Sequence, residues 1–168
     1  ESSNKKKIKI ANKYIQASLN YKKGNNVYYL KEFNEIIESQ DSTYAPLALF
    51  FLIDNEILNS KEEINQLMDK VISKVNLEKE IKNLMIYKKA LINADFQTES
   101  NIINILKPLI NTESIWKPHS LLLLGDYFLS KGDKNKAKDF YLQILVLKNV
   151  DKNILSQAQT RIRRNFSE

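Results

Sequence analysis

Four helix-capping residues recur at nearly constant spacing, and this recurrence limits the folds open to the chain. They stand 35, 38 and 35 residues apart: Asn25, Ser60, Thr98 and Asp133. Each has a side chain that accepts hydrogen bonds from the free N–H groups at a helix start. Repeats of this length are typical of stacked helix pairs, because one pair cannot bury its apolar face alone.

Apolar side chains follow each cap at the same spacing, which we call the repeat register. Positions four, eight, eleven and twelve residues after each cap are apolar or aromatic, which predicts one buried face on the second helix of each pair. The sixteen residues are Tyr29, Phe33, Ile36, Ile37, Ile64, Met68, Val71, Ile72, Ile102, Leu106, Leu109, Ile110, Ala137, Tyr141, Ile144 and Leu145. Eight residues before the caps, Ala17, Ala90 and Gly125 favour close helix contacts. Leu52 takes the fourth such place and predicts a splayed or shifted second pair.

Few chain breakers interrupt this pattern. Three Gly and three Pro in 168 residues are too few for the turns of a sandwich or barrel, and no period-2 run of strand length occurs. We therefore expect one all-α domain over residues 1–168, with antiparallel hairpins stacked in a right-handed superhelix. The expected hairpins cover about 5–40, 43–75, 77–111 and 115–149. A capping helix at 151–166, which starts at Asp151 and turns Arg161, Arg163 and Arg164 towards solvent, would close the stack.

The last hairpin carries a recognisable set of small, aliphatic and aromatic residues. Its members are Leu121, Leu124, Gly125, Phe128, Gly132, Ala137, Tyr141 and Ile144. Their spacing resembles that of the tetratricopeptide repeat, with Asn149 where that family usually has proline. The other three hairpins keep the length and second-helix pattern of the repeat but not its first-helix signature.

A shorter segment carries a more specific resemblance. Gly125-Asp126, the run from Ser130 to Lys134, and Ala137 are similar to the ancillary Sec-translocon subunits of bacteria and their alphaproteobacterial relatives. The resemblance implies one inner-membrane helix followed by a periplasmic repeat domain. It also implies partners among periplasmic chaperones, translocon components and newly exported proteins.

The chain as given contains no candidate membrane helix. Its longest apolar run, residues 45–53, is too short to cross a bilayer, and we expect a soluble chain. It begins with Glu1 rather than Met, which fits an N-terminal anchor that has been removed. Lysines at 5, 6, 7 and 9 oppose this interpretation, because positive charge favours the cytoplasmic end of an anchor. A cytoplasmic location is the alternative.

Composition excludes most enzyme classes. The chain has no Cys and one His, His119, which rules out cysteine nucleophiles and multi-histidine metal sites. Three scattered glycines cannot form a phosphate-binding loop. We expect no catalytic residue, no metal and no cofactor, with His119 at the surface near the start of a helix. The expected function is a non-catalytic protein-interaction module.

Net charge leaves a second class of function open. The formal charge is +6 and the pI is about 9.3, so a nucleic-acid-associated or regulatory protein is the alternative. Lysine outnumbers arginine 23 to 3, although arginine is the residue usually enriched at phosphate and base contacts. We expect no specific nucleic-acid partner.

A peptide groove is the predicted binding site. The same hairpin offset, eleven residues before each cap, is occupied by Tyr14, Leu49, Tyr87 and Leu122, and His119 lies one turn before Leu122. If these side chains are exposed, they form a strip for an extended or unfolded client segment. The alternative is that neighbouring helices bury them.

Overall fold

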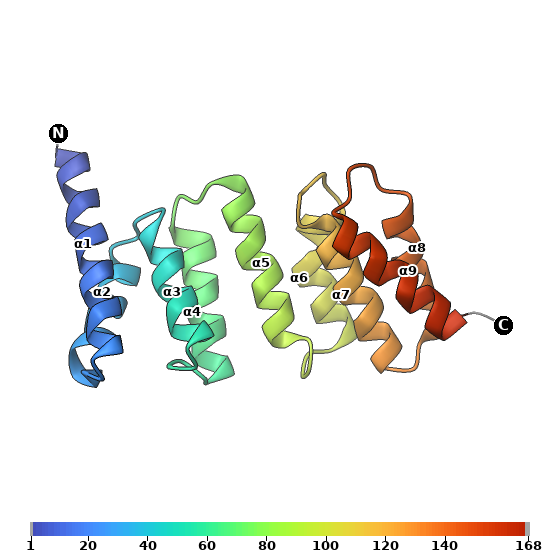
Figure 1. The fold of residues 1–168 in the computed structure, drawn as a ribbon, viewed down its shortest axis with the longest axis horizontal. Helices are drawn as coiled ribbons and strands as arrows, with labels where there is room; N and C mark the ends of the chain where they lie inside the picture. The colour runs from blue at the N-terminus through green and yellow to red at the C-terminus, as the bar shows by residue number, and fades with distance from the viewer. Residues whose placement is uncertain (1, 167–168) are drawn as a thin grey trace. The chain divides into compact units, whose positions relative to one another are not determined.

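The computed structural model describes residues 2–166, apart from the side chains of residues 26 and 27. Within that range the chain forms nine helices and no strand (Figure 1), which confirms the all-α prediction. The helices are α1 (Ser2–Lys22), α2 (Asn26–Glu38), α3 (Tyr44–Asp54), α4 (Lys61–Lys74), α5 (Lys79–Asn93), α6 (Glu99–Ile110), α7 (Lys117–Ser130), α8 (Lys134–Leu145) and α9 (Lys152–Phe166). Within residues 2–166, none of them has both the length and the apolar character needed to cross a bilayer.

The chain divides into two compact units, Glu1–Met85 and Ile86–Glu168, with the boundary inside α5. In each unit, consecutive helices joined by short loops run in opposite directions (Figure 1). The prediction of a single superhelical repeat domain over residues 1–168 stays a prediction.

Four of the five predicted caps make the expected hydrogen bonds. The side chains of Ser60, Thr98 and Asp133 accept a backbone N–H three residues ahead, at 3.4, 3.3 and 3.1 Å. Asp151 accepts two backbone N–H groups of α9, at 2.8 and 3.3 Å. Asn25 takes the cap position of α2, but its side chain makes no capping bond within the described residues. Helices α4, α6, α8 and α9 therefore begin directly after their predicted caps.

The predicted buried face is also present. All but three of the sixteen register positions are buried; Ile72 and Ile110 are half-buried, and Leu145 is 38% exposed. The burial follows from the 3.6-residue period, which brings positions four, eight, eleven and twelve to one side of a helix. The position eight residues before each cap is buried in all four cases, including Leu52.

Leu52 lies in the pair formed by α3 and α4, for which the sequence predicts a splayed or shifted packing. α3 and α4 approach each other less closely than α1 and α2 do. The loop after α3 folds back on this residue, because the backbone N–H groups of Ile57 and Leu58 both donate to the Leu52 carbonyl at 3.0 Å.

The C-terminal unit is built around α7, which packs against α6, α8 and α9. Gly125 of α7 faces the ring of Tyr141 on α8. A Cβ atom at Gly125 would lie 2.7 Å from Cδ1 of Tyr141, closer than real side chains approach. The absence of a side chain at Gly125 therefore allows α7 and α8 to pack as closely as they do.

A polar network then binds α9 to this pair. The Tyr141 hydroxyl donates to Oδ1 of Asp126 at 2.6 Å. The Arg161 guanidinium donates from Nε to the same oxygen at 2.8 Å and from a terminal nitrogen to Oδ2 at 3.1 Å. The prediction that Arg161 faces solvent is therefore wrong, because α9 packs back on α7 and α8 and turns this residue towards Asp126.

Alkaline pH is expected to weaken the C-terminal unit through this tyrosine. Burial raises the pKa of Tyr141 well above its usual range, and the hydrogen bond to Asp126 raises it further. The unfolded chain ionises near the ordinary tyrosine pKa of about 10, whereas the folded chain resists ionisation. The stabilising contribution is thus complete below the unfolded pKa and is lost as pH rises towards the folded one. Denaturant unfolding between about pH 8 and 11 measures this loss.

Tyr141→Phe is the matched variant for this measurement. Its unfolding free energy should fall less steeply with pH than that of the parent chain. Part of the slope remains, because burial also raises the pKa values of Tyr14, Tyr87 and Tyr127. If the unfolding free energies of variant and parent fall equally steeply with pH, Tyr141 does not contribute to the alkaline loss of stability.

Candidate functional site

A cleft of about 920 Å³ opens in the C-terminal unit between the loop before α7 and the loop after α8. It is lined by residues 113–119 and 146–151. The two lining segments lie about thirty residues apart in sequence, and neither belongs to the repeat register. We refer to this space as the interloop cleft.

Three aromatic rings form one side of the interloop cleft and its support. Trp116 stacks on Tyr87 of α5, with ring centroids 5.6 Å apart and an interplanar angle of 21°. The centroid of the His119 ring lies 4.9 Å from that of Trp116 and 5.9 Å from that of Tyr87. Burial raises the pKa of Tyr87, and the Asp126 carboxylate raises it further. The three rings thus form one packed aromatic cluster.

Local hydrogen bonds fix Trp116 at the start of α7. Its backbone N–H donates to Oγ of Ser114 at 3.0 Å, and its carbonyl accepts from Oγ of Ser120 at 2.7 Å. Pro118 occupies the first turn of α7, where its missing N–H costs nothing. The backbone of the aromatic cluster is therefore held in place before any ligand arrives.

Two ring nitrogens of the cluster have unused hydrogen-bonding capacity. Nε1 of Trp116 and Nδ1 of His119 are buried and have no protein partner among the described residues. An unsatisfied buried polar group costs about 1–3 kcal/mol. Both atoms are inaccessible to solvent in this structure.

The rim of the interloop cleft is apolar at two exposed points. Val146 is 81% exposed and Ile115 is 66% exposed. The charged lining residues balance one another: Lys117 and Lys148 against Glu113 and Asp151. The arrangement suits an apolar segment with mixed or no net charge, because neither sign of charge dominates.

The predicted groove residues separate into two groups. Tyr87 and His119 meet in the aromatic cluster beside the interloop cleft. Leu49 is fully buried and Leu122 is 8% exposed, so neither side chain lines an open surface. For these two leucines the burial alternative holds, because their helices are covered by neighbours on that face.

Tyr14 lies in the N-terminal unit, within a separate aromatic cluster. Its ring centroid is 5.8 Å from Phe33, 5.6 Å from Tyr44 and 6.4 Å from Phe51. The side chain is half-buried, and burial raises the pKa of its phenol. Its contacts are those of a packing residue at the edge of a core.

Trp116 and Val146 were not predicted as site residues from the sequence. One signal was present, because Val146, Leu147 and Val150 continue the apolar character of the chain beyond the last buried register position, Ile144. Asn149, which stands where the tetratricopeptide pattern has proline, adopts a left-handed φ of 57°.

Within residues 2–166, no group of three or more His, Cys, Asp or Glu side chains is placed to hold a metal ion. The lining of the interloop cleft offers apolar contact from Ile115 and Val146 and hydrogen bonding from its polar residues. No family model, no curated protein and no solved structure matches this chain.

Proposed function

We propose that this chain is a non-catalytic protein-interaction module that binds an extended apolar segment of a partner protein in the interloop cleft. The observation that carries the proposal is the apolar rim, Ile115 and Val146, beside the fixed Trp116–His119 cluster. Aromatic anchors next to exposed aliphatic side chains are typical of binding hot spots, because they bury large areas at a small cost in side-chain entropy.

The repeat pattern supports a tetratricopeptide-like superhelix as the scaffold of this module. Four capping side chains and the buried register positions agree with stacked helix pairs. Residues 125–137 support a relationship to the ancillary Sec-translocon subunits. On this proposal the partners are unfolded or extended segments of exported proteins, or translocon and chaperone components, on the periplasmic side of a bacterial inner membrane. A cytoplasmic module is the alternative.

Val146→Asp tests the interloop cleft. This side chain is 81% exposed, so the substitution should leave the free energy of unfolding nearly unchanged. A charge at the apolar rim should weaken binding of an unfolded client about tenfold, equivalent to about 1.4 kcal/mol. Reduced, carboxymethylated lactalbumin serves as a permanently unfolded client, and calorimetry or thermophoresis gives the Kd.

Leu142→Asp is the matched control, because Leu142 is 40% exposed on α8 and does not line the cleft. It should bind the client as the parent chain does. If both variants bind equally well, the interloop cleft is not the binding site. Submicromolar binding of single-stranded RNA that persists at about 0.2 M salt would instead favour the nucleic-acid alternative.

A further inference from the structure

The outer side of α1 carries a row of exposed aliphatic side chains. Ile8 is 62% exposed, Ile15 is 57% exposed and Leu19 is 42% exposed. Their spacing places them within about 40° of one another around the helix. We call these three residues the outer stripe. The opposite side of α1 is the packed side, where Ala17 is buried and Tyr21 contacts Tyr29 of α2 at 5.3 Å.

Lysines surround the outer stripe. α1 contains six lysines and no acidic residue, in a chain whose formal net charge is +6. Lys5, Lys9 and Lys22 flank the stripe around the helix, and all three are exposed. Lys13 instead forms an ion pair with Glu35 of α2. The hydrogen bond from its ammonium group holds the pKa of the Glu35 carboxyl below its usual range. The net positive charge of the chain is thus concentrated on the helix that bears the stripe.

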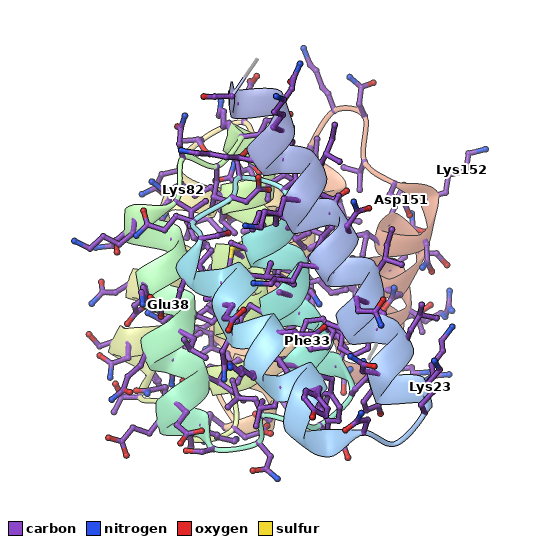
Figure 2. All side chains as sticks on the ribbon, turned by 90° about the vertical axis from the view of Figure 1, so that its left-hand side faces the viewer. Lys23, Phe33, Glu38, Lys82, Asp151 and Lys152 are labelled. Atoms are coloured by element: carbon purple, nitrogen blue, oxygen red, sulfur yellow. The ribbon has the colours of Figure 1, made fainter. Side chains whose placement is uncertain are left out.

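The surface continues from α1 onto α2. A shallow hollow of about 530 Å³ lies between α1 and α2, where the lysines of its lining face two carboxylates. Its lining residues are Lys9, Asn12, Lys13, Gln16, Tyr28, Lys31, Glu32 and Glu35. Tyr28 is 59% exposed. Figure 2 views the N-terminal unit from the side of α1 and α2, and shows Lys23 extending away from the ribbon just after α1. A tyrosine beside aliphatic and lysine side chains is the composition of a membrane–water interface.

A second copy of the chain does not suit this surface. Stable interfaces bury about 800 Å² on each partner, far more than three partly exposed aliphatic side chains provide. Two copies of α1 would also repel each other, because each carries six lysines and no acidic residue. Nucleic acid fits poorly as well, because α1 contains no arginine, the residue usually enriched at phosphate and base contacts.

We propose that α1 lies on an anionic membrane surface, with the outer stripe in the interfacial region and Lys5, Lys9 and Lys22 among the anionic headgroups. Aliphatic side chains gain by leaving water, and each lysine gains by approaching negative lipid. The proposal is independent of the interloop cleft. It also goes beyond the expectation that only a separate anchor contacts the membrane.

Vesicle binding by the full chain tests the proposal. The chain should bind vesicles of phosphatidylglycerol mixed with phosphatidylcholine and should not bind phosphatidylcholine alone. Replacing Lys5, Lys9 and Lys22 with Gln should weaken binding about fivefold per lysine, as expected for about 1 kcal/mol each. Replacing Ile8, Ile15 and Leu19 with Ser should weaken binding at least about tenfold, because the aliphatic contribution is lost.

Matched triple variants serve as controls. The first control replaces three exposed lysines outside α1 with Gln, and so changes the net charge as much as the lysine variant does. These lysines are Lys74, Lys107 and Lys134. The second control replaces three exposed leucines outside α1 with Ser, as many aliphatic side chains as the stripe variant loses. These leucines are Leu47, Leu91 and Leu142. Both controls should bind anionic vesicles as the parent chain does, and circular dichroism checks that every variant is folded.

A single spin label gives a second readout. The chain has no cysteine, so Ile15→Cys can carry the only nitroxide, whose collisions with oxygen should increase on anionic vesicles. No binding to anionic vesicles would overturn the proposal, and so would equal binding by the stripe variant and its control. RNA binding that the Lys5, Lys9 and Lys22 variant loses would assign the surface to nucleic acid. A dimer that the stripe variant abolishes would assign it to a second copy.

Discussion

Gly125→Ala is expected to lower the free energy of unfolding of the C-terminal unit by roughly 1–3 kcal/mol, because the added methyl group overpacks against Tyr141. The sign of this change in the free energy of unfolding distinguishes a steric clash from a helix-propensity effect. In an ordinary helix the same change stabilises by about 1 kcal/mol, since alanine has a far better helix propensity than glycine. The neighbour cannot yield easily, because the Tyr141 ring is fully buried and its hydroxyl is bonded to Asp126.

The Tyr141→Val background isolates the steric cause. Valine lacks every ring atom that the new methyl group would meet. In this background Gly125→Ala should become neutral or stabilising. Denaturant unfolding of the parent, both single variants and the double variant gives the coupling energy. A cost that stays the same in the valine background would show that the close contact of α7 with α8 is not its source.

Asp126→Ala is expected to loosen α9 as well as lower stability. The buried Tyr141 hydroxyl loses its acceptor, at a cost of about 1–3 kcal/mol. The ion pair with Arg161 adds less than about 1 kcal/mol, because both side chains are partly exposed, at 40% and 30%. Hydrogen exchange of the backbone amides of α9 should therefore accelerate more than exchange in α6.

Asp139→Ala provides the control, since it removes one exposed carboxylate from α8 without touching this network. It should leave both exchange and stability nearly unchanged. A Tyr141→Phe background should reduce the cost of Asp126→Ala, because no hydroxyl is then left unpaired. Unchanged exchange in α9 after Asp126→Ala would mean that apolar contacts alone hold this helix.

Local features of the chain were predictable. The capping bonds of Ser60, Thr98 and Asp133 join residues three apart, and helical periodicity decides which side chains share a face. The close approach at Gly125 was also visible, because few other residues suit a crowded helix contact. Such features depend on short-range geometry, which the sequence expresses directly.

Features that depend on packing between distant segments were not predictable in the same way. Arg161 meets Asp126 across 35 residues, and periodicity within α9 does not show which flank turns inwards. Leu49 shares its offset with Tyr14, yet it is buried because neighbouring helices cover it. The interloop cleft is formed by two loops, and loops carry no period from which their approach could be inferred.

The helix α1 shows a related ambiguity. It has one apolar side that packs, with Ala17 and Tyr21, and a second apolar row formed by Ile8, Ile15 and Leu19. Both sides satisfy a helical period. Only the packing of α2 and α3 against α1 decides which of them stays in contact with solvent.

The position of Trp116 gives the interloop cleft its own reporter. It is the only tryptophan of the chain, and it lies in the lining of the cleft, stacked on Tyr87 and beside His119. Indole emission depends on the polarity and the hydrogen bonding around the ring. An occupant that changes the polarity of the cleft therefore changes the fluorescence of unlabelled protein. Candidate partners can be screened by this signal even when their own sequences are unknown.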